Sequence, residues 1–156
     1  MRPNLLPLLL LLLPGCASNS IVMNEFVADN ATGITDSTGT PDWVELANLD
    51  SEEVSLDGWS ISDDYSTPGR HPLDGLTIPG NGYLLLIAAG DSALGDEYLS
   101  FRLSASGEAL LLSDADGIVD DINYLAQQTD LAMARQPDGT GDWVEGVVPT
   151  PGAPNQ

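Results

Sequence analysis

The sequence contains no lysine, one histidine and one cysteine. Four arginines are its only permanent cations, and they face 24 aspartates and glutamates, so the formal net charge is −20. Proteins bind nucleic acid mainly through lysine and arginine, which displace condensed counterions from the phosphates. The composition therefore argues against direct binding of DNA or RNA, and it predicts a surface that repels anionic headgroups.

The shortage of histidine and lysine also limits catalysis. Nucleophilic catalysis needs a base beside the nucleophile, and the single histidine, His71, lies in a turn-rich loop where we expect it to be solvated. Glu25 and Glu45 lie in strand-like motifs, and alternation places Glu45 on the same face as Trp43. Such a carboxylate pair could serve a glycoside hydrolase. A structural role in hydrogen bonding is the favoured interpretation, so we predict no catalytic residue.

With a single cysteine, Cys16, the monomer cannot form an internal disulfide, and its stability must come from packing. The cysteine follows Arg2 and a leucine-rich run over residues 5–13, which is shorter than the ~20 residues that a membrane-spanning helix needs. Residues 13–16, Leu-Pro-Gly-Cys, resemble the lipobox of bacterial lipoproteins. We therefore predict a signal peptide over residues 1–15, lipidation at Cys16, a short tether over 17–20 and one folded domain over 21–156.

This N-terminal segment predicts export and attachment to a membrane through the lipid anchor on Cys16. Ala17 after the cysteine resembles the sorting pattern for the outer membrane of Gram-negative bacteria. The expected location is therefore the outer membrane or cell surface of a bacterium. The alternative, an ordinary thiol beside a normal cleavage site, would leave a lone reactive cysteine in an exported protein.

The mature chain consists of short strand-like runs separated by turns that contain Gly, Pro, Asn or Asp. The runs span residues 21–28, 43–49, 54–56, 58–62, 83–88, 98–103, 109–113 and 118–124. Residues 83–89 are continuously apolar and favour a fully buried strand, whereas 130–136 could form a helical turn. The pattern predicts an all-β antiparallel sandwich or barrel, and the long polar loops over 30–41 and 63–72 are candidates to carry function.

Seven motifs, in their order along the chain, resemble the lamin-tail domain family. They span residues 21–26, 42–48, 56–64, 82–86, 101–108, 135–139 and 149–155. The resemblance implies an immunoglobulin-like antiparallel β-sandwich, a domain found at the end of nuclear lamins and in exported bacterial proteins. In lamins the domain is an interaction surface linked to chromatin, which the acidity of this chain contradicts. The bacterial versions resemble adhesive or tethering units.

Carboxylate clusters make calcium the first ion to consider as a ligand. Asp63 and Asp64, near Asp42 in the family pattern, form one candidate calcium site. Residues 114–121 contain a second acidic cluster, but it lacks the full EF-hand spacing, and a hairpin turn explains it as well. The alternative for every cluster is a solvated acidic surface.

Aromatic and basic side chains give a further set of candidates. Trp143, near the C-terminal loop, is the candidate ligand-binding aromatic, because the other two tryptophans lie in motifs typical of strand cores. Arg70, Arg102 and Arg135 are the only cations of the mature chain, and we expect each to pair with carboxylates.

The sequence favours a non-catalytic tethering or adhesion module of the cell envelope, whose partner is a surface protein or a glycan. A second hypothesis is a calcium-dependent carbohydrate-binding accessory protein. A third is a small hydrolase that uses Glu25 and Glu45. The three differ in what they bind, and all of them assume the same acidic β-domain.

Overall fold

The computed structural model describes residues 20–156, so the predicted signal peptide, Cys16 and the first three residues of the predicted tether lie outside the described residues. The strands are β1 (Ile21–Val27), β2 (Asp42–Asn48), β3 (Val54–Ser55), β4 (Ser60–Ser62), β5 (His71–Pro72), β6 (Thr77–Ile78), β7 (Tyr83–Ala88), β8 (Gly107–Asp114), β9 (Gly117–Leu125), β10 (Ala132–Gln136) and β11 (Asp142–Val147). One 3-10 turn, η1 (Ser92–Leu94), is the helical element within residues 20–156. Among these residues no helix has the length and apolarity needed to cross a membrane.

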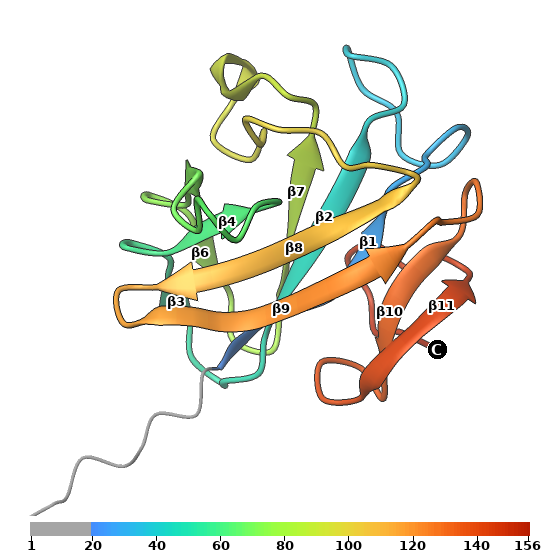
Figure 1. The fold of residues 1–156 in the computed structure, drawn as a ribbon. Coiled ribbons are helices and arrows are strands. Elements are labelled where there is room, and N and C mark those ends of the chain that lie inside the picture. The colour runs from blue at the N-terminus through green and yellow to red at the C-terminus, as the bar shows by residue number, and fades with distance from the viewer. Residues whose placement is uncertain (1–19) are drawn as a thin grey trace, which may run out of the picture.

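The strands form two main antiparallel sheets that pack face to face (Figure 1). The five-stranded sheet has the order β11-β10-β1-β2-β7, and the four-stranded sheet has the order β5-β4-β8-β9. Strands β3 and β6 pair in a small separate ribbon. In Figure 1, β8 and β9 cross in front of β1, β2 and β7. The predicted all-β antiparallel sandwich is confirmed.

The core lies between the two sheets. Met23 and Phe26 of β1 and Leu46 of β2 pack with Leu110 and Leu112 of β8, and all five side chains are fully buried. Burying a side chain of this size contributes about 1.5–3 kcal/mol, so these five side chains stabilise the packing of the two sheets.

A bulge in β1 decides which side chains face away from the core. The pairing with β2 shifts between Met23 and Glu25, so Asn24 is an extra residue in the ladder. After this bulge Phe26 points into the core, whereas Glu25 and Val27 point to the opposite side of the sheet. We call that side the outer face.

Four features of the strands differ from the expectation. Residues 130–136 contain a strand, β10, in place of a helical turn, and β11 was not among the expected runs. The expected strand over 98–103 is absent, because only Tyr98 forms an isolated parallel bridge, to Ile87. Alternate side chains of residues 98–103 are buried, as they would be in a strand, but the backbone of this segment has no continuous hydrogen-bonded partner strand. Strand β7 is fully buried only in its second half.

Candidate functional site

The structure does not gather the three carboxylates of the candidate calcium site. Oδ1 of Asp42 accepts a hydrogen bond from the backbone N–H of Asn30 at 2.9 Å. Asp63 forms an ion pair with Arg70, and Asp64 accepts hydrogen bonds from the N–H and hydroxyl of Ser66 at 2.8 and 2.7 Å. Within residues 20–156 no group of three or more His, Cys, Asp or Glu side chains is arranged to hold a metal ion. Calcium binding at these residues stays a prediction without a cluster to support it.

The second acidic cluster forms a turn. Oδ1 of Asp114 accepts hydrogen bonds from the backbone N–H groups of Asp116 and Gly117, at 2.8 and 3.1 Å. These bonds close the hairpin between β8 and β9. The hairpin interpretation of residues 114–121 therefore accounts for their spacing.

Trp143 on β11 is half-buried, and its ring is engaged by two neighbours. Its ring centroid lies 5.5 Å from that of Phe26 in an edge-on arrangement, and the guanidinium of Arg135 lies 4.7 Å from the ring centroid. These contacts are typical of core packing and of a cation–π interaction. Trp143 thus packs against Phe26 and Arg135, and ligand binding at this residue stays a prediction.

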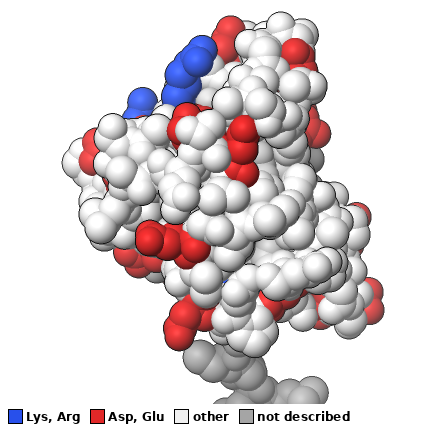
Figure 2. All heavy atoms as spheres, turned by 90° about the vertical axis from the view of Figure 1, so that its right-hand side faces the viewer, with Lys and Arg blue, Asp and Glu red and all other residues white. Residues whose placement is uncertain are grey.

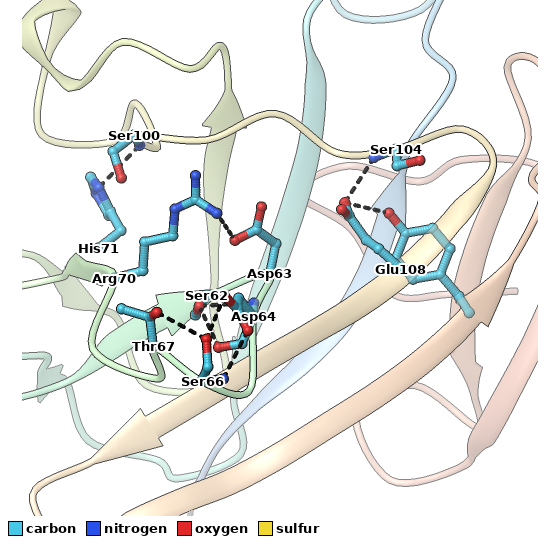
Figure 3. Close-up of polar contacts among 11 residues, drawn as sticks. Ser62, Asp63, Asp64, Ser66, Thr67, Arg70, His71, Ser100, Ser104 and Glu108 are labelled. Atoms are coloured by element: carbon cyan, nitrogen blue, oxygen red, sulfur yellow. Dashed lines mark hydrogen bonds and ion pairs between the residues drawn. The ribbon is translucent and has the colours of Figure 1, made fainter.

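Two of the three arginines form ion pairs, and the single histidine is buried. Arg135 pairs with Asp120 at 2.7 Å and Arg70 pairs with Asp63, as expected. The ion pairs found over residues 20–156 do not include Arg102. His71 was expected to be solvated, but it is 6% exposed, and its Nδ1 accepts a hydrogen bond from the N–H of Ser100 (Figure 3). Burial lowers the pKa of His71, so it is held as a neutral acceptor.

The outer face holds the two buried glutamates. Glu25 and Glu45 are direct cross-strand partners in the β1–β2 ladder, and both are fully buried. Directly opposed residues on one face of a sheet have Cβ atoms about 4.5–5.5 Å apart, so these carboxylates are neighbours. Trp43 pairs with Val27 on the same face, which confirms that Glu45 and Trp43 share one side of the sheet.

Residues 148–156, which we call the tail, cover these glutamates. The backbone N–H of Thr150 donates to both carboxylate oxygens of Glu25, at 3.0 and 3.1 Å. The N–H of Gly152 donates to Oε2 of Glu45 at 2.5 Å. The tail therefore binds the sheet through hydrogen bonds to side chains, and it adds no strand to the ladder.

A second set of bonds fastens the tail farther along. Nδ2 of Asn24 donates to Glu45 at 3.0 Å and to Asp138 at 3.1 Å, while its Oδ1 accepts from the N–H of Gly139 at 2.8 Å. Asn155 donates from its backbone N–H to Asp138 at 2.8 Å and from its side chain to Asn24. The bulge at Asn24 thus creates the hub that links β1, the β10–β11 loop and the tail.

Burial changes the acidity of the glutamate pair. Desolvation raises the pKa of Glu25 to about 7, repulsion from Glu45 and Asp138 adds to the rise, and the Thr150 N–H opposes it. Burial likewise raises the pKa of Glu45, against hydrogen bonds from Gly152 and Asn24. The facing charges are all acidic, so the pair favours the neutral form far more than an exposed glutamate does.

A pocket of about 380 Å³ lies beside the glutamates on the outer face. Val27 and Trp43 come from the sheet, Ile34 from the loop after β1, and Pro149 and Pro151 from the tail. Apolar side chains therefore supply its floor and two of its walls. A preformed apolar pocket with a few polar groups is the usual form of a binding site.

The loop that forms one wall is held in shape by two polar side chains. Asn30 donates to the carbonyls of Ile34 and Pro41, both at 2.7 Å. Asp130 accepts from the N–H groups of Ala31 and Thr32 at 2.7 and 2.8 Å. The loop over 30–41, which the sequence predicted as a candidate for function, thus lines the pocket and is held in shape by these hydrogen bonds.

A model of the lamin tail domain family matches residues 15–126. The chain belongs to the lamin tail domain family. Comparison with the curated proteins and with the solved structures gives no match. Immunoglobulin-like lamin tail domains are typically non-catalytic, and membership indicates a binding or interaction module.

The matched region ends before β10, β11 and the tail, so the match does not include the residues that cover the glutamates. Sequence reasoning did not foresee that the tail covers Glu25 and Glu45. The available signal was indirect: two acidic residues in apolar strand motifs, in a chain with almost no cations to neutralise them.

Proposed function

We propose that this lamin tail domain is a non-catalytic tethering or adhesion module, displayed at the bacterial cell envelope by a lipid on Cys16, and that its pocket binds a segment of a surface protein. The proposal rests chiefly on where the pocket lies. Strand β1 begins one residue after Ser20, near the anchored end of the chain, and Val27 at its other end lines the pocket. Seven residues of strand span roughly 23 Å, so Val27 and the pocket that it lines lie near the end of β1 away from the proposed anchor.

The lining favours a protein partner over a glycan. Sugar-binding sites use exposed aromatic faces, but Trp43 is 1% exposed, Trp59 packs against the core and Trp143 contacts Phe26 and Arg135. A pocket walled by Ile34 and two prolines instead suits an apolar side chain of a partner. Acidic groups are scattered over the face drawn in Figure 2, and they would favour a partner that is neutral or basic nearby.

The same geometry weakens the hydrolase hypothesis. A carboxylate that acts as an acid or a base must reach the substrate within hydrogen-bond distance. The oxygens of Glu25 and Glu45 already accept hydrogen bonds from Thr150, Gly152 and Asn24, and neither side chain is exposed. We therefore assign the pair a structural role.

Anchoring is tested by fractionation in the native host. Wild-type protein should fractionate with membranes and take up labelled fatty acid, whereas Cys16→Ala should be released or mislocalised. Recovery of the wild type as an unlipidated soluble species would contradict the anchoring half of the proposal.

Binding is tested with the same host. The exported Cys16→Ala protein should capture an envelope protein in a pull-down, and Ile34→Arg should lose that capture because it fills the pocket with a charged chain. Ile118→Arg on β9 is the matched control, since Ile118 is 44% exposed and the charge change is identical. Equal capture by both variants, with unchanged melting temperatures, would show that the pocket is not the binding site.

One observation favours the carbohydrate alternative. Tyr65 is 44% exposed, and its hydroxyl donates to Asp121 at 2.5 Å and accepts from Asn123 at 2.9 Å. An aromatic ring beside fixed polar groups is a plausible sugar platform. A glycan array, run with and without calcium, should then show binding that Tyr65→Ala abolishes and Ile34→Arg leaves intact.

A further inference from the structure

The tail is a thin cover over deeply buried groups. Six of its nine residues are exposed, yet Asn24, Glu25 and Glu45 beneath it are completely buried. It contains no charged or titratable side chain of its own. Hydrogen bonds hold it in place: Thr150 and Gly152 donate to the two glutamates, and Asn155 donates to Asp138 and Asn24.

The groups that face the two glutamates are acidic or neutral on every packed element. Strand β10 places Ala134 opposite Glu25, and the β10–β11 loop contributes Asp138. Strand β7 contributes Tyr83, whose hydroxyl donates to Asp138 at 2.7 Å. Arg135 directs its guanidinium to Asp120 and to backbone carbonyls of Met23 and Gly141, not to the pair.

We propose that the tail is a pH-dependent cover of the pocket, which the glutamate pair holds closed when it carries a proton and releases when both carboxylates are ionised. Two opposed carboxylates without a cation repel each other, and water can solvate them only if the tail leaves. Opening therefore relieves both the repulsion and the cost of burying charge.

The direction of the pH effect follows from proton linkage. The pKa of Glu25 is about 7 beneath the tail, against an ordinary value of 4.5 once it is exposed to water. The closed form therefore binds more protons between these two values. Its extra stability is fully present below pH 4.5 and is lost as the pH rises through 7, so the tail should open at neutral to alkaline pH.

Opening would change the pocket of the proposed function, on which this part of the inference rests. Pro149 and Pro151 flank Thr150 and form one wall of the pocket. Release of Thr150 from Glu25 would move both prolines together. The pocket would then be closed on one side at acidic pH and widened at alkaline pH.

Hydrogen exchange on the exported Cys16→Ala protein tests the inference without any partner. The amides of Thr150 and Gly152 should lose at least about tenfold protection between pH 5.5 and pH 8.5, after correction for intrinsic exchange. Glu25→Gln should keep them protected at pH 8.5, because a neutral amide oxygen still accepts from Thr150. Glu53→Gln, at an exposed position, should behave as the wild type.

Two outcomes would overturn the inference. Equal corrected protection at both pH values would show that the pair does not control the tail. Loss of protection in Glu25→Gln at both pH values would show that the hydrogen bond from Thr150 requires an ionised carboxylate at position 25. Neither outcome depends on whether a partner is found, so failure of the proposed function and failure of this inference are distinguished.

Discussion

The two faces of the five-stranded sheet are buried in different ways. The inner face is covered by another sheet, and its contacts are apolar side chains such as Met23, Phe26 and Leu46. The outer face has a smaller apolar cluster around Val27 and Trp43, and beside it the tail is held by hydrogen bonds to Glu25 and Glu45. Apolar packing is insensitive to pH, whereas bonds to carboxylates depend on their ionisation. Local openings should therefore begin at the outer face.

The largest effect is expected from aromatic truncation. Phe26→Ala should lower the free energy of unfolding by about 3–5 kcal/mol, because the ring is fully buried between the sheets. Trp43→Ala should cost about 3 kcal/mol, since the ring is equally buried but borders the pocket. Urea titration followed by circular dichroism measures both. A loss below ~1 kcal/mol for Trp43 would mean that the outer face is not packed in solution.

The hub beneath the tail should give the next largest effect. Asn24→Ala removes bonds to Glu45, Asp138, Gly139 and Asn155 together, and it should cost about 2–3 kcal/mol. Asn155→Ala removes only the side-chain hydrogen bonds from the tail to this hub, and it should lower the free energy of unfolding by about 1 kcal/mol. Equal losses in the two variants would show that the tail, and not the bulge, carries the stability of this network.

The pH dependence of unfolding sharpens the comparison further. Because burial raises the pKa of Glu25, its contribution to stability is present at acidic pH and lost as the pH rises through about 7. The stability of Glu25→Gln relative to wild type should therefore increase by about 1–2 kcal/mol from pH 5 to pH 8. Thermal melts of both proteins across this range test the sign. A relative stability that falls with pH would contradict it.

The sequence predicted strands well where apolar alternation was long and bounded by turns, as in β1, β2, β8 and β9. It failed at β11, where Gly146 and two acidic residues interrupt the pattern of an edge strand. It also failed over residues 98–103, because alternation reports the burial of side chains and not the presence of a backbone partner. His71 was missed for a related reason, since a two-residue strand is too short to show a period.

The site was less predictable than the fold. The sequence placed Glu25 and Glu45 in strand-like motifs, and the β1–β2 register makes them direct partners. No local pattern predicted that the tail covers the two glutamates, because Thr150 lies 125 residues from Glu25 in the chain. Contacts of this separation depend on the complete topology, and the extra residue at Asn24 redirects the alternation on which such a prediction would rest.

The smallest effects are expected from ions. Sodium chloride should raise the melting temperature by a few degrees, because it screens the self-repulsion of a chain with a formal charge of −20. At equal ionic strength, calcium and sodium should raise the melting temperature equally if the carboxylates of Asp42, Asp63 and Asp64 keep their separate hydrogen bonds and ion pair. A rise specific to millimolar calcium and not reproduced by magnesium would restore a calcium site.

The central position of β1 has a mechanical consequence if the proposed anchor at Cys16 tethers the domain by its N-terminus. Strand β1 is hydrogen-bonded to β10 on one side and to β2 on the other. If the anchor holds residue 20 and a partner pulls at the opposite end, the load runs along the axis of β1. The ladder bonds then share the force in shear and do not unzip one after another, so the strand nearest the anchor is also the one best placed to resist extraction.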